Sequence, residues 1–358
     1  MNAPREDVSA FATRIIEWHE RFGRHDLPWQ QSRDPYRIWL SEVMLQQTQV
    51  ATVVPYYARF LAAFPDITAL AHASIDDVLR HWSGLGYYRR ARHLHEAAKI
   101  IVHDHGGVFP RELDAIAALP GIGRSTAAAI AAFSFGTRAA ILDGNVKRVL
   151  ARHRGIEGYP GESTIERALW QVAEAELPTR NIERYTQAMM DLGATVCLRS
   201  RPRCDMCPVA KDCTALLTHR LETIPAPRPA RDLPQRAVQV LLIASGDAWL
   251  FERRPSTGVW ADLWSLPEVD VDVDAAGACR TRFGIEVIET DALPPLQHGF
   301  THYRLTLQPV RVRVYGRVRI AQAPQYTWLS RDAALAGALP APIKRLVEAH
   351  CVSAPVLA

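Results

Sequence analysis

The sequence lacks any uninterrupted apolar run of the length that a membrane-spanning helix needs. Its N-terminal region also lacks a basic stretch followed by a short apolar run, so we expect no secretory signal and a cytoplasmic location. A large excess of charge is missing as well, since 42 basic and 38 acidic side chains leave a net charge of +4. Any nucleic-acid-binding function must therefore be argued from motifs and not from net charge.

Length and composition exclude a disordered chain and a small disulfide-stapled fold. The chain has 358 residues, of which 48% are hydrophobic and 22% are charged. Such proportions are typical of ordinary globular proteins. At roughly 150 residues per domain, the length allows about two domains.

Apolar residues up to about residue 215 recur every three or four positions, as Phe11, Ile15 and Trp18 show. This is the period of successive amphipathic helices, so we expect an all-α domain over residues 1–223. Residues 224–236 contain four prolines and few residues that could pack in a core. This composition predicts an extended linker.

After the linker the period shortens to two residues, which is the pattern of β-strands. Three stretches alternate in this way, at residues 236–245, 248–254 and 304–320. Two helices are expected among them, at 274–284 and 340–350. Residues 237–358 are therefore predicted to form a second domain of mixed α and β structure.

Four of the six cysteines lie within 17 residues, as Cys197, Cys204, Cys207 and Cys213. Disulfides are disfavoured in a cytoplasmic protein. The C-x6-C-x2-C-x5-C spacing suits a structural zinc ion or a [4Fe-4S] cluster, and spacing alone leaves both open. The isolated Cys279 and Cys351 are expected to be buried core residues.

A tight turn followed by a helix is expected within residues 119–136, where Gly121 and Gly123 permit close approach of the backbone. The free amides of a helix start suit a phosphate group, but a plain turn between helices has the same pattern. Asp143 and Asn145 follow in a short loop before a basic helical run. An aspartate in such a loop is usually an N-cap or turn residue, so these motifs alone do not establish a site.

Five segments together closely resemble the MutY family of adenine DNA glycosylases. They are SEVMLQQTQV at 41–50, GLGYYRRARHLH at 84–95, LPGIGRSTAAAI at 119–130, LDGNVKR at 142–148 and QAMMDLGATVC at 187–197. The resemblance implies an all-α helix-hairpin-helix glycosylase core with a [4Fe-4S] cluster loop, followed by a C-terminal α+β Nudix-like domain. It also implies that the four clustered cysteines bind the cluster.

The function implied by this resemblance is base excision repair of DNA. The enzyme would be an adenine-specific DNA N-glycosylase that releases adenine paired with 8-oxoguanine and, more weakly, with guanine. Its partner would be double-stranded DNA with these mispairs, bound by a nucleoid-associated monomer. The nearest alternative is a bifunctional glycosylase for oxidised pyrimidines. Alternatives from other classes are a non-catalytic iron–sulfur DNA-binding protein and a Nudix pyrophosphatase.

Two carboxyl groups of unlike protonation suit cleavage of a glycosidic bond. The resemblance implies that Glu42 is the general acid and that Asp143 is the ionised carboxylate stabilising the cationic sugar, with Asn145 orienting it. The related endonuclease III family has a nucleophilic lysine where this chain has Ser125, so we expect a monofunctional enzyme. Lys147 is nearby in sequence but does not occupy that lysine position.

An adenine within a duplex must be extruded before it can be excised. The family residues that enter the duplex correspond here to Gln47, Thr48, Leu85 and Tyr87, with Gly121 and Gly123 at the DNA backbone. The resemblance places Tyr87 beside the 8-oxoguanine. Ordinary core packing is the alternative for Leu85 and the interpretation we favour for Tyr88.

Two groups of arginines could contact the DNA backbone. Arg89, Arg90 and Arg92 either meet phosphates or form a solvated helix face. Arg199, Arg201 and Arg203 lie between the first two clustered cysteines and predict a second backbone-binding patch. The cluster would then organise a DNA-binding loop.

Residues 258–268 resemble part of the Nudix fold. The acidic R-E-x-x-E-E helix that holds magnesium in Nudix hydrolases does not follow them, so we expect no pyrophosphate hydrolysis. The family reads 8-oxoguanine with a short F-S-H loop, whose counterpart here is Phe300, Thr301 and His302. The alternative is that this loop is simply the start of a strand.

Overall fold

The computed structural model describes residues 10–229, 232–314 and 324–351. The chain forms two compact units, which are Met1–His72 with His93–Ala230, and Ala73–Arg92 with Arg231–Ala358. This division reflects which residues contact one another in the folded chain, and it does not show which segments fold independently. The domain bounds expected from the sequence, 1–223, 224–236 and 237–358, therefore stay a prediction.

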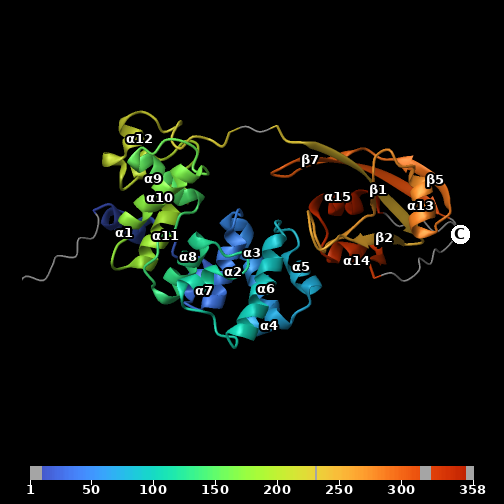
Figure 1. The fold of residues 1–358 in the computed structure, drawn as a ribbon, viewed down its shortest axis with the longest axis horizontal. Coiled ribbons are helices and arrows are strands. Elements are labelled where there is room, and N and C mark those ends of the chain that lie inside the picture. The colour runs from blue at the N-terminus through green and yellow to red at the C-terminus, as the bar shows by residue number, and fades with distance from the viewer. Residues whose placement is uncertain (1–9, 230–231, 315–323, 352–358) are drawn as a thin grey trace, which may run out of the picture. The chain divides into compact units, whose positions relative to one another are not determined.

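The first unit is built from helices joined by short connections (Figure 1). Its α-helices are α1 (Ala10–Phe22), α2 (Pro35–Leu45), α3 (Val50–Ala63), α4 (Ile67–His72), α6 (Arg89–Asp104), α7 (Leu113–Ala117), α8 (Arg124–Phe135), α9 (Gly144–Arg154), α10 (Ser163–Ala175), α11 (Ile182–Asp191) and α12 (Thr214–Leu217). Short turns are η1 (Pro28–Gln31), the π-helical η2 (Leu192–Val196), η3 (Cys204–Met206) and η4 (Ala210–Asp212). The expected all-α domain is confirmed.

Helices α8 and α9 have clear start and stop signals in the sequence. Gly136 and Gly155 end them in the left-handed conformation, with φ of 70° and 67°. Asp143 caps the N-terminus of α9 by accepting a hydrogen bond from the Val146 amide. The buried residues of α8 are mostly alanines, whose small side chains let α2 pack closely against this helix.

The second unit contains the helix α5 (Ile75–Trp82) and a mixed sheet with three further helices (Figure 1). The strands are β1 (Gln235–Ser245), β2 (Ala248–Arg253), β3 (Trp264–Ser265), β4 (Glu268–Val269), β5 (Val287–Ala292), β6 (Leu296–Gly299), β7 (Arg304–Val314) and β8 (Tyr326–Ser330). The main strand order is β3-β2-β1-β7-β5, with β1 and β7 parallel. The helices are α13 (Ala275–Phe283), α14 (Arg331–Ala336) and α15 (Ala341–His350).

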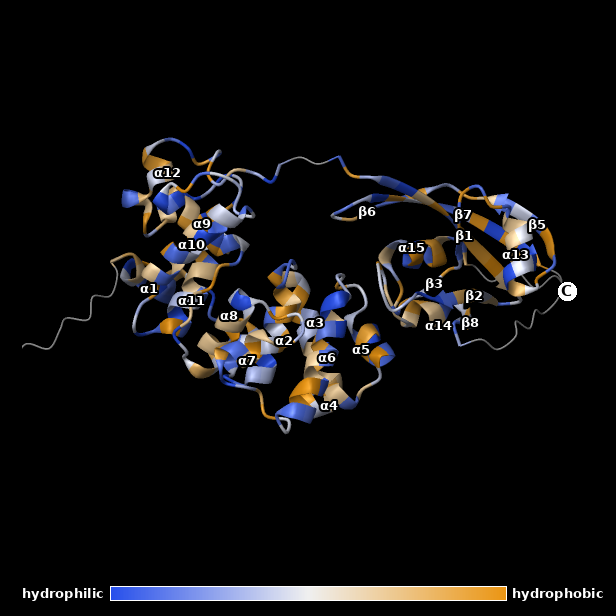
Figure 2. Ribbon diagram, in the orientation of Figure 1, coloured by the Kyte–Doolittle hydropathy of each residue, from blue (hydrophilic) through white to orange (hydrophobic). Residues whose placement is uncertain are grey.

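The strand β1 includes hydrophobic residues (Figure 2), and alternate ones belong to two different cores. Val240 and Leu242 pack with residues of α14 and α15, whereas Leu241 and Ile243 pack with residues of α13. Successive side chains of a strand point to opposite faces, so the sheet has helices on both sides. This arrangement confirms the predicted α+β domain.

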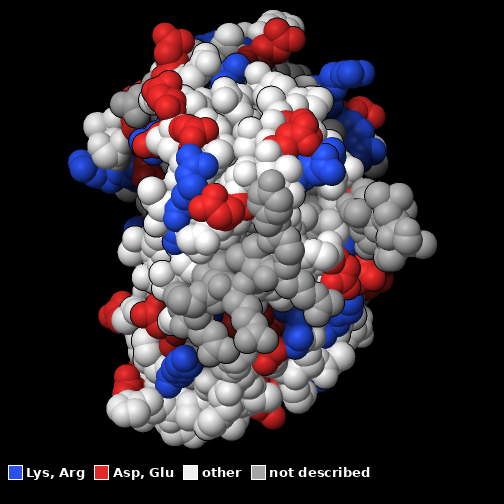
Figure 3. Space-filling model, turned by 90° about the vertical axis from the view of Figure 1, so that its right-hand side faces the viewer, with Lys and Arg blue, Asp and Glu red and all other residues white. Residues whose placement is uncertain are grey.

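The strands and helices expected after the linker lie within one or two residues of the observed β1, β2, α13 and α15. The expected strand 304–320 is observed as β7 up to Val314, and its last residues lie outside the described part of the chain. Within the described residues, no helix is long and apolar enough to span a membrane. Figure 3 shows basic and acidic side chains interspersed over one face, in keeping with the small net charge.

Candidate active site and cysteine cluster

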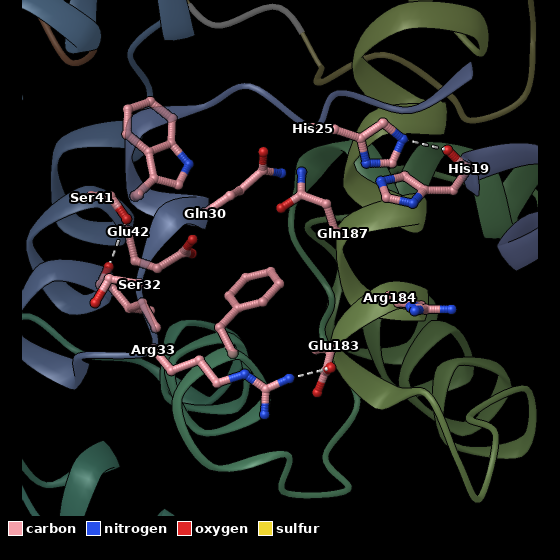
Figure 4. Close-up of a pocket in the computed structure, with 13 residues that line it drawn as sticks. His19, His25, Gln30, Ser32, Arg33, Ser41, Glu42, Glu183, Arg184 and Gln187 are labelled. Atoms are coloured by element: carbon pink, nitrogen blue, oxygen red, sulfur yellow. Dashed lines mark hydrogen bonds and ion pairs between the residues drawn. The ribbon is translucent and has the colours of Figure 1, made fainter. Parts of the chain in front are cut away.

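A pocket of about 290 Å³ opens between α2 and α11 in the first unit (Figure 4). Glu42 enters it from α2 and Gln187 from α11, and the indole of Trp29 forms part of the wall. The remaining lining residues are His19, His25, Gln30, Ser32, Arg33, Ile38, Ser41, Phe133, Glu183 and Arg184. A small, partly apolar pocket with several convergent polar groups is typical of a ligand site.

The carboxyl group of Glu42 is held in its protonated form by its surroundings. Burial is the larger cause and the charge of Asp143 the smaller, and together they raise the pKa of Glu42 to about 8. The neighbouring apolar residues Val43 and Met44 are buried, and apolar surroundings disfavour the charged form of a carboxyl group. Glu42 is therefore mostly protonated at neutral pH.

Asp143 lies at the start of α9, 101 positions after Glu42 in the sequence. Its Oδ1 accepts a hydrogen bond of 2.8 Å from the Val146 amide. Burial raises the pKa of Asp143, while hydrogen bonds from Val146 and Asn145 oppose that increase. The helix start thus provides amide hydrogens that stabilise the ionised carboxylate.

Asn145 is fixed on both sides. Its Oδ1 accepts a hydrogen bond of 3.0 Å from Arg148, which also donates to the Gly193 carbonyl at 2.7 Å. A Cβ atom on Gly193 would lie 2.5 Å from the Cβ of Asn145. Only glycine allows η2 to approach the first turn of α9 this closely.

Ser125 holds the segment that precedes Asp143. Its Oγ accepts a hydrogen bond of 2.9 Å from the Leu142 amide. Lys147 points elsewhere, because its Nζ forms an ion pair of 2.6 Å with Glu166 and donates to the Pro160 carbonyl. Neither Ser125 nor the paired Lys147 therefore provides a free amine at the position of Ser125.

A buried network beside the pocket was missed by sequence reasoning. Asp191 is fully buried and accepts hydrogen bonds from the side chain and amide of Arg24 and from Gln187. Burial alone would raise the pKa of Asp191, but hydrogen bonds from His19 and Arg24 lower it. Gln187 and Asp191 lie in the recognised segment 187–197, whereas His19 and Arg24 lie in no motif.

The predicted hairpin lies between α7 and α8. Gly121 has φ of +77°, and a Cβ there would lie 2.8 Å from the His93 side chain. Its carbonyl accepts a hydrogen bond of 3.3 Å from Gln46. Gly123 is the N-cap of α8 and has open space around it. The first amides of α8 have no carbonyl partner within the helix, and contact of the hairpin with a phosphate stays a prediction.

The residues predicted to enter the duplex are distributed over both units. In the first unit, Gln47 is exposed and has φ of 56°, and the amide of Thr48 donates to Leu45. In the second unit, Tyr87 is 50% exposed with φ of 49°, whereas Leu85 is 6% exposed. Their roles at DNA stay predictions.

Arg90 is a structural residue in this fold. It is buried, and its Nη2 donates to the Gly86 carbonyl at 3.1 Å. Burial lowers its pKa to about 10. The guanidinium therefore stabilises the turn that carries Tyr87. This role differs from both sequence-based interpretations of Arg90, which were contact with a phosphate and a solvated helix face.

The four clustered cysteines line one small cavity together with Arg152. None of them is in a disulfide. Arg152 lies 3.5 Å from the Sγ of Cys197 and donates to the carbonyls of Leu198 and Arg199. Burial raises the pKa of Cys207 to about 12, so this thiol is protonated unless a metal replaces its proton. In the described part of the chain, no group of three or more His, Cys, Asp or Glu side chains already has metal-binding spacing.

In the second unit, the predicted lesion-reading loop connects β6 and β7. The Phe300 amide donates to the Tyr303 carbonyl at 2.9 Å, which forms a tight turn. Thr301 and His302 are exposed at its tip, and Phe300 is half-buried. The α13 segment, AAGACRTRF, contains no acidic residue, so it cannot supply the carboxylates of a Nudix hydrolase.

Comparisons with known proteins identify two domain families in the chain. Residues 40–175 match the family model of the HhH-GPD superfamily base excision DNA repair proteins, and residues 239–349 match the NUDIX domain model. The chain is 34% identical to the adenine DNA glycosylase of Buchnera aphidicola over 94% of its own length and 97% of that protein. It is 31% identical to the adenine DNA glycosylase of Homo sapiens over 96% of its own length and 74% of that protein.

The chain belongs to the adenine DNA glycosylase family. It is therefore an N-glycosylase of base excision repair, with a helix-hairpin-helix core and a Nudix-like C-terminal domain. Its fold resembles a thermostable thymine-DNA glycosylase, with a TM-score of 0.53 and 28% identity over 61% of this chain and 100% of that chain. A trapped endonuclease III–DNA covalent intermediate shares the fold, with a TM-score of 0.50 and 21% identity over 58% of this chain and 95% of that chain.

Proposed function

We propose that this adenine DNA glycosylase removes adenine paired with 8-oxoguanine and, more slowly, adenine paired with guanine, and that it leaves an abasic site without cutting the strand. The observation that carries the proposal is the pair formed by Glu42 and Asp143. One carboxyl group has a pKa of about 8 and lines a pocket, and the other lies at a helix start. Two carboxyl groups with such different environments suit an acid and a charge stabiliser.

Glu42 acts first, as the general acid. Neutral adenine is a poor leaving group, and protonation by a carboxylic acid lets the bond to the sugar break with its electron pair going to the base. Because the pKa of Glu42 is about 8, the acid carries its proton at neutral pH. The pocket is partly apolar, which disfavours the charged form of this acid.

Asp143 acts on the sugar. Departure of the base leaves an oxocarbenium-like cation, which an ionised carboxylate stabilises. Burial raises the pKa of Asp143, and the hydrogen bonds from Val146 and Asn145 oppose that rise, which favours the ionised form and one orientation of the carboxylate. Water then adds to the sugar, and a proton passes to a carboxylate of the pair.

Ser125 supports the monofunctional part of the proposal. A lyase needs an amine that forms a Schiff base with the opened sugar. Ser125 instead accepts a hydrogen bond from Leu142, and the amine of Lys147 is paired with Glu166. The alternative of a bifunctional glycosylase for oxidised pyrimidines therefore lacks its nucleophile.

The second unit supports the choice of 8-oxoguanine as the opposite base. Tyr87 projects an aromatic ring into solvent from a strained turn, as an intercalating residue would. Thr301 and His302 are exposed polar side chains that could read a base edge. Phe300 is half-buried and packs against the core of the second unit, which anchors the loop that carries Thr301 and His302.

A [4Fe-4S] cluster fits the four cysteines, because their thiols are free of disulfides and line one cavity. Bound there, the cluster would supply structural order and no step of the glycosidic chemistry. Arg152 donates to the carbonyls of Leu198 and Arg199, which directly follow Cys197. Arg199, Arg201 and Arg203 are exposed. These arginines suit contact with the phosphates of DNA.

A single-turnover assay tests the proposed function. Purified protein is incubated with a duplex that contains one adenine opposite 8-oxoguanine, and each sample is divided and analysed with and without hot alkali. We expect cleavage of the adenine strand only after alkali, and loss of this product in Glu42→Gln. The control Glu17→Gln changes an exposed glutamate of α1 in the same way and should retain full activity. Cleavage without alkali would overturn the monofunctional proposal, and no product from a protein that binds the duplex would overturn the enzymatic one.

A further inference from the structure

The ring of Phe300 is surrounded by aromatic side chains from three parts of the second unit. Ring centroids lie 4.6 Å away for His298, 4.7 Å for Tyr303 and 5.2 Å for Trp260. The ring of Trp260 also contacts His298, at 5.6 Å. His298 and Tyr303 flank the turn in sequence, but Trp260 comes from a loop 40 positions earlier. Trp260 therefore supplies a long-range aromatic contact to Phe300 of the recognition turn.

The loop that carries Trp260 has a strained backbone. Trp260 and Asp262 have φ of 58° and 60°, values that residues other than glycine rarely adopt. Hydrogen bonds from the Asp262 amide to Pro255 and from the Leu263 amide to Trp260 hold this conformation. Ala261 and Leu263 are buried beneath it. A backbone held in this way directs the indole toward Phe300, and such strain is concentrated at functional sites.

The tip of the turn shows what this packing achieves. Thr301 and His302 are exposed. The ring of His302 lies 4.8 Å from that of Tyr303 and 6.0 Å from that of Phe300, so the aromatic group around Phe300 supports the tip of the turn. The guanidinium of Arg236 lies 5.0 Å from the ring of Tyr303, and Arg304 is exposed at the start of β7. Aromatic rings and cations at one edge of a sheet form a surface that suits a nucleic acid strand.

We propose that Trp260 is a specificity-determining positioning residue, whose indole fixes Phe300 and thereby sets the pose of Thr301 and His302 against an 8-oxopurine opposite the target adenine. The inference rests on the proposed function and names a residue that the recognition-loop motif does not contain. It assigns Trp260 to selection of the opposite base and not to release of adenine. The ratio of excision rates opposite 8-oxoguanine and opposite guanine should therefore respond to this residue.

The test compares single-turnover excision from A:8-oxoguanine and A:G duplexes by the wild type, Trp260→Ala and Trp260→Phe. We expect Trp260→Ala to lower the rate ratio by about three- to tenfold, the range that one aromatic pair supplies, with the A:G rate nearly unchanged. Trp260→Phe keeps a ring against Phe300 and should retain most of the ratio. The matched control Trp328→Ala removes an indole from the other core of the same unit and should leave the ratio unchanged.

Equal loss of both rates in Trp260→Ala, or an unchanged ratio, would overturn this inference. If Trp260→Ala does not fold, Trp260→Leu keeps apolar volume without a ring, and its ratio decides in the same way. A double variant with Thr301→Ala gives a second readout, since a shared role predicts that the two losses do not add. A wild type with no preference for 8-oxoguanine would instead refute the proposed function, and this result is distinct from the others.

Discussion

Glu42 combines two properties that a general acid for adenine release needs. It lies in the wall of a pocket, and burial beside Asp143 raises its pKa to about 8. The motif around Glu42 predicted its role, but the size and cause of the pKa shift depend on the folded surroundings. Asp143 lies far away in sequence, so its electrostatic effect on Glu42 exists only in the folded chain.

The raised pKa of Glu42 predicts the pH dependence of excision. The active form is the protonated acid, so the single-turnover rate should fall by up to about tenfold per pH unit above a pH of about 8. Below that value the acid stays protonated, and the rate should change little until Asp143 begins to take up a proton. Rates measured from pH 6 to 10 on one duplex test this. A rate that keeps rising between pH 8 and 10 would contradict the assigned role.

The same shift makes a prediction about stability. The native state holds the Glu42 proton up to about pH 8, whereas the unfolded state releases it near its usual value of 4.5, so stability contributed by this group declines as pH rises through that window. Glutamine does not titrate, so Glu42→Gln removes this loss of stability at high pH. Relative to its effect at pH 4, the substitution should raise the free energy of unfolding at pH 8 by roughly 2 to 4 kcal/mol, at about 1.4 kcal/mol per pKa unit. Denaturant unfolding at both pH values measures this. An equal effect at both would show that Glu42 titrates normally.

At the scale of elements, helix α9 connects Asp143 with the cysteine loop. Asp143 caps its start, Arg148 contacts η2, and Arg152 holds the cysteine loop. Gly193 lets η2 approach the first turn of α9 closely. The position of Asp143 therefore depends on packing that no local sequence pattern describes.

Substitution of Gly193 tests this packing. Gly193→Ala places a Cβ 2.5 Å from Asn145, so the first turn of α9 must move, and we expect at least a roughly tenfold loss of excision rate through misplacement of Asp143. Gly144→Ala is the matched control, because its Cβ would meet open space in the same turn. Excision and duplex binding are measured for both. Equal effects of the two substitutions would refute this role of Gly193.

If the four clustered cysteines bind a [4Fe-4S] cluster, the purified protein contains iron that depends on them. Cys204→Ser should lower the iron content of the purified protein and weaken duplex binding, since the loop would lose one of four thiol ligands. Cys279→Ser, at a buried cysteine of α13, should leave iron content unchanged. Iron analysis and visible absorption give the result. Zinc in place of iron in the wild type would refute the cluster while retaining a metal site.

Sequence reasoning succeeded where a signal is local and failed where contacts are long-range. The strands and helices of the second unit follow from the period of apolar residues, and motifs identified Glu42 and Asp143 as candidates. The network of Arg24 and Asp191 was missed because it joins segments 167 positions apart. Trp260 was missed for the same reason, since only the folded sheet brings it against Phe300.

At the scale of the whole molecule, the two units have different predicted tasks. The first unit contains the acid pocket, Asp143 and the cysteine cluster, and the second contains Tyr87 and the recognition turn. Substitutions of Glu42 and Asp143 should therefore alter the rate on every substrate, whereas substitutions in the recognition turn should alter the preference among opposite bases.

The most direct test of this account is the single-turnover release of free adenine from A:8-oxoguanine and A:G duplexes by the wild type, Glu42→Gln and His302→Ala. We predict that Glu42→Gln loses at least about 100-fold on both duplexes, as expected for removal of a general acid. His302→Ala should slow release opposite 8-oxoguanine and change release opposite guanine little. Adenine release that persists in Glu42→Gln, or an equal loss on both duplexes in His302→Ala, would contradict the account.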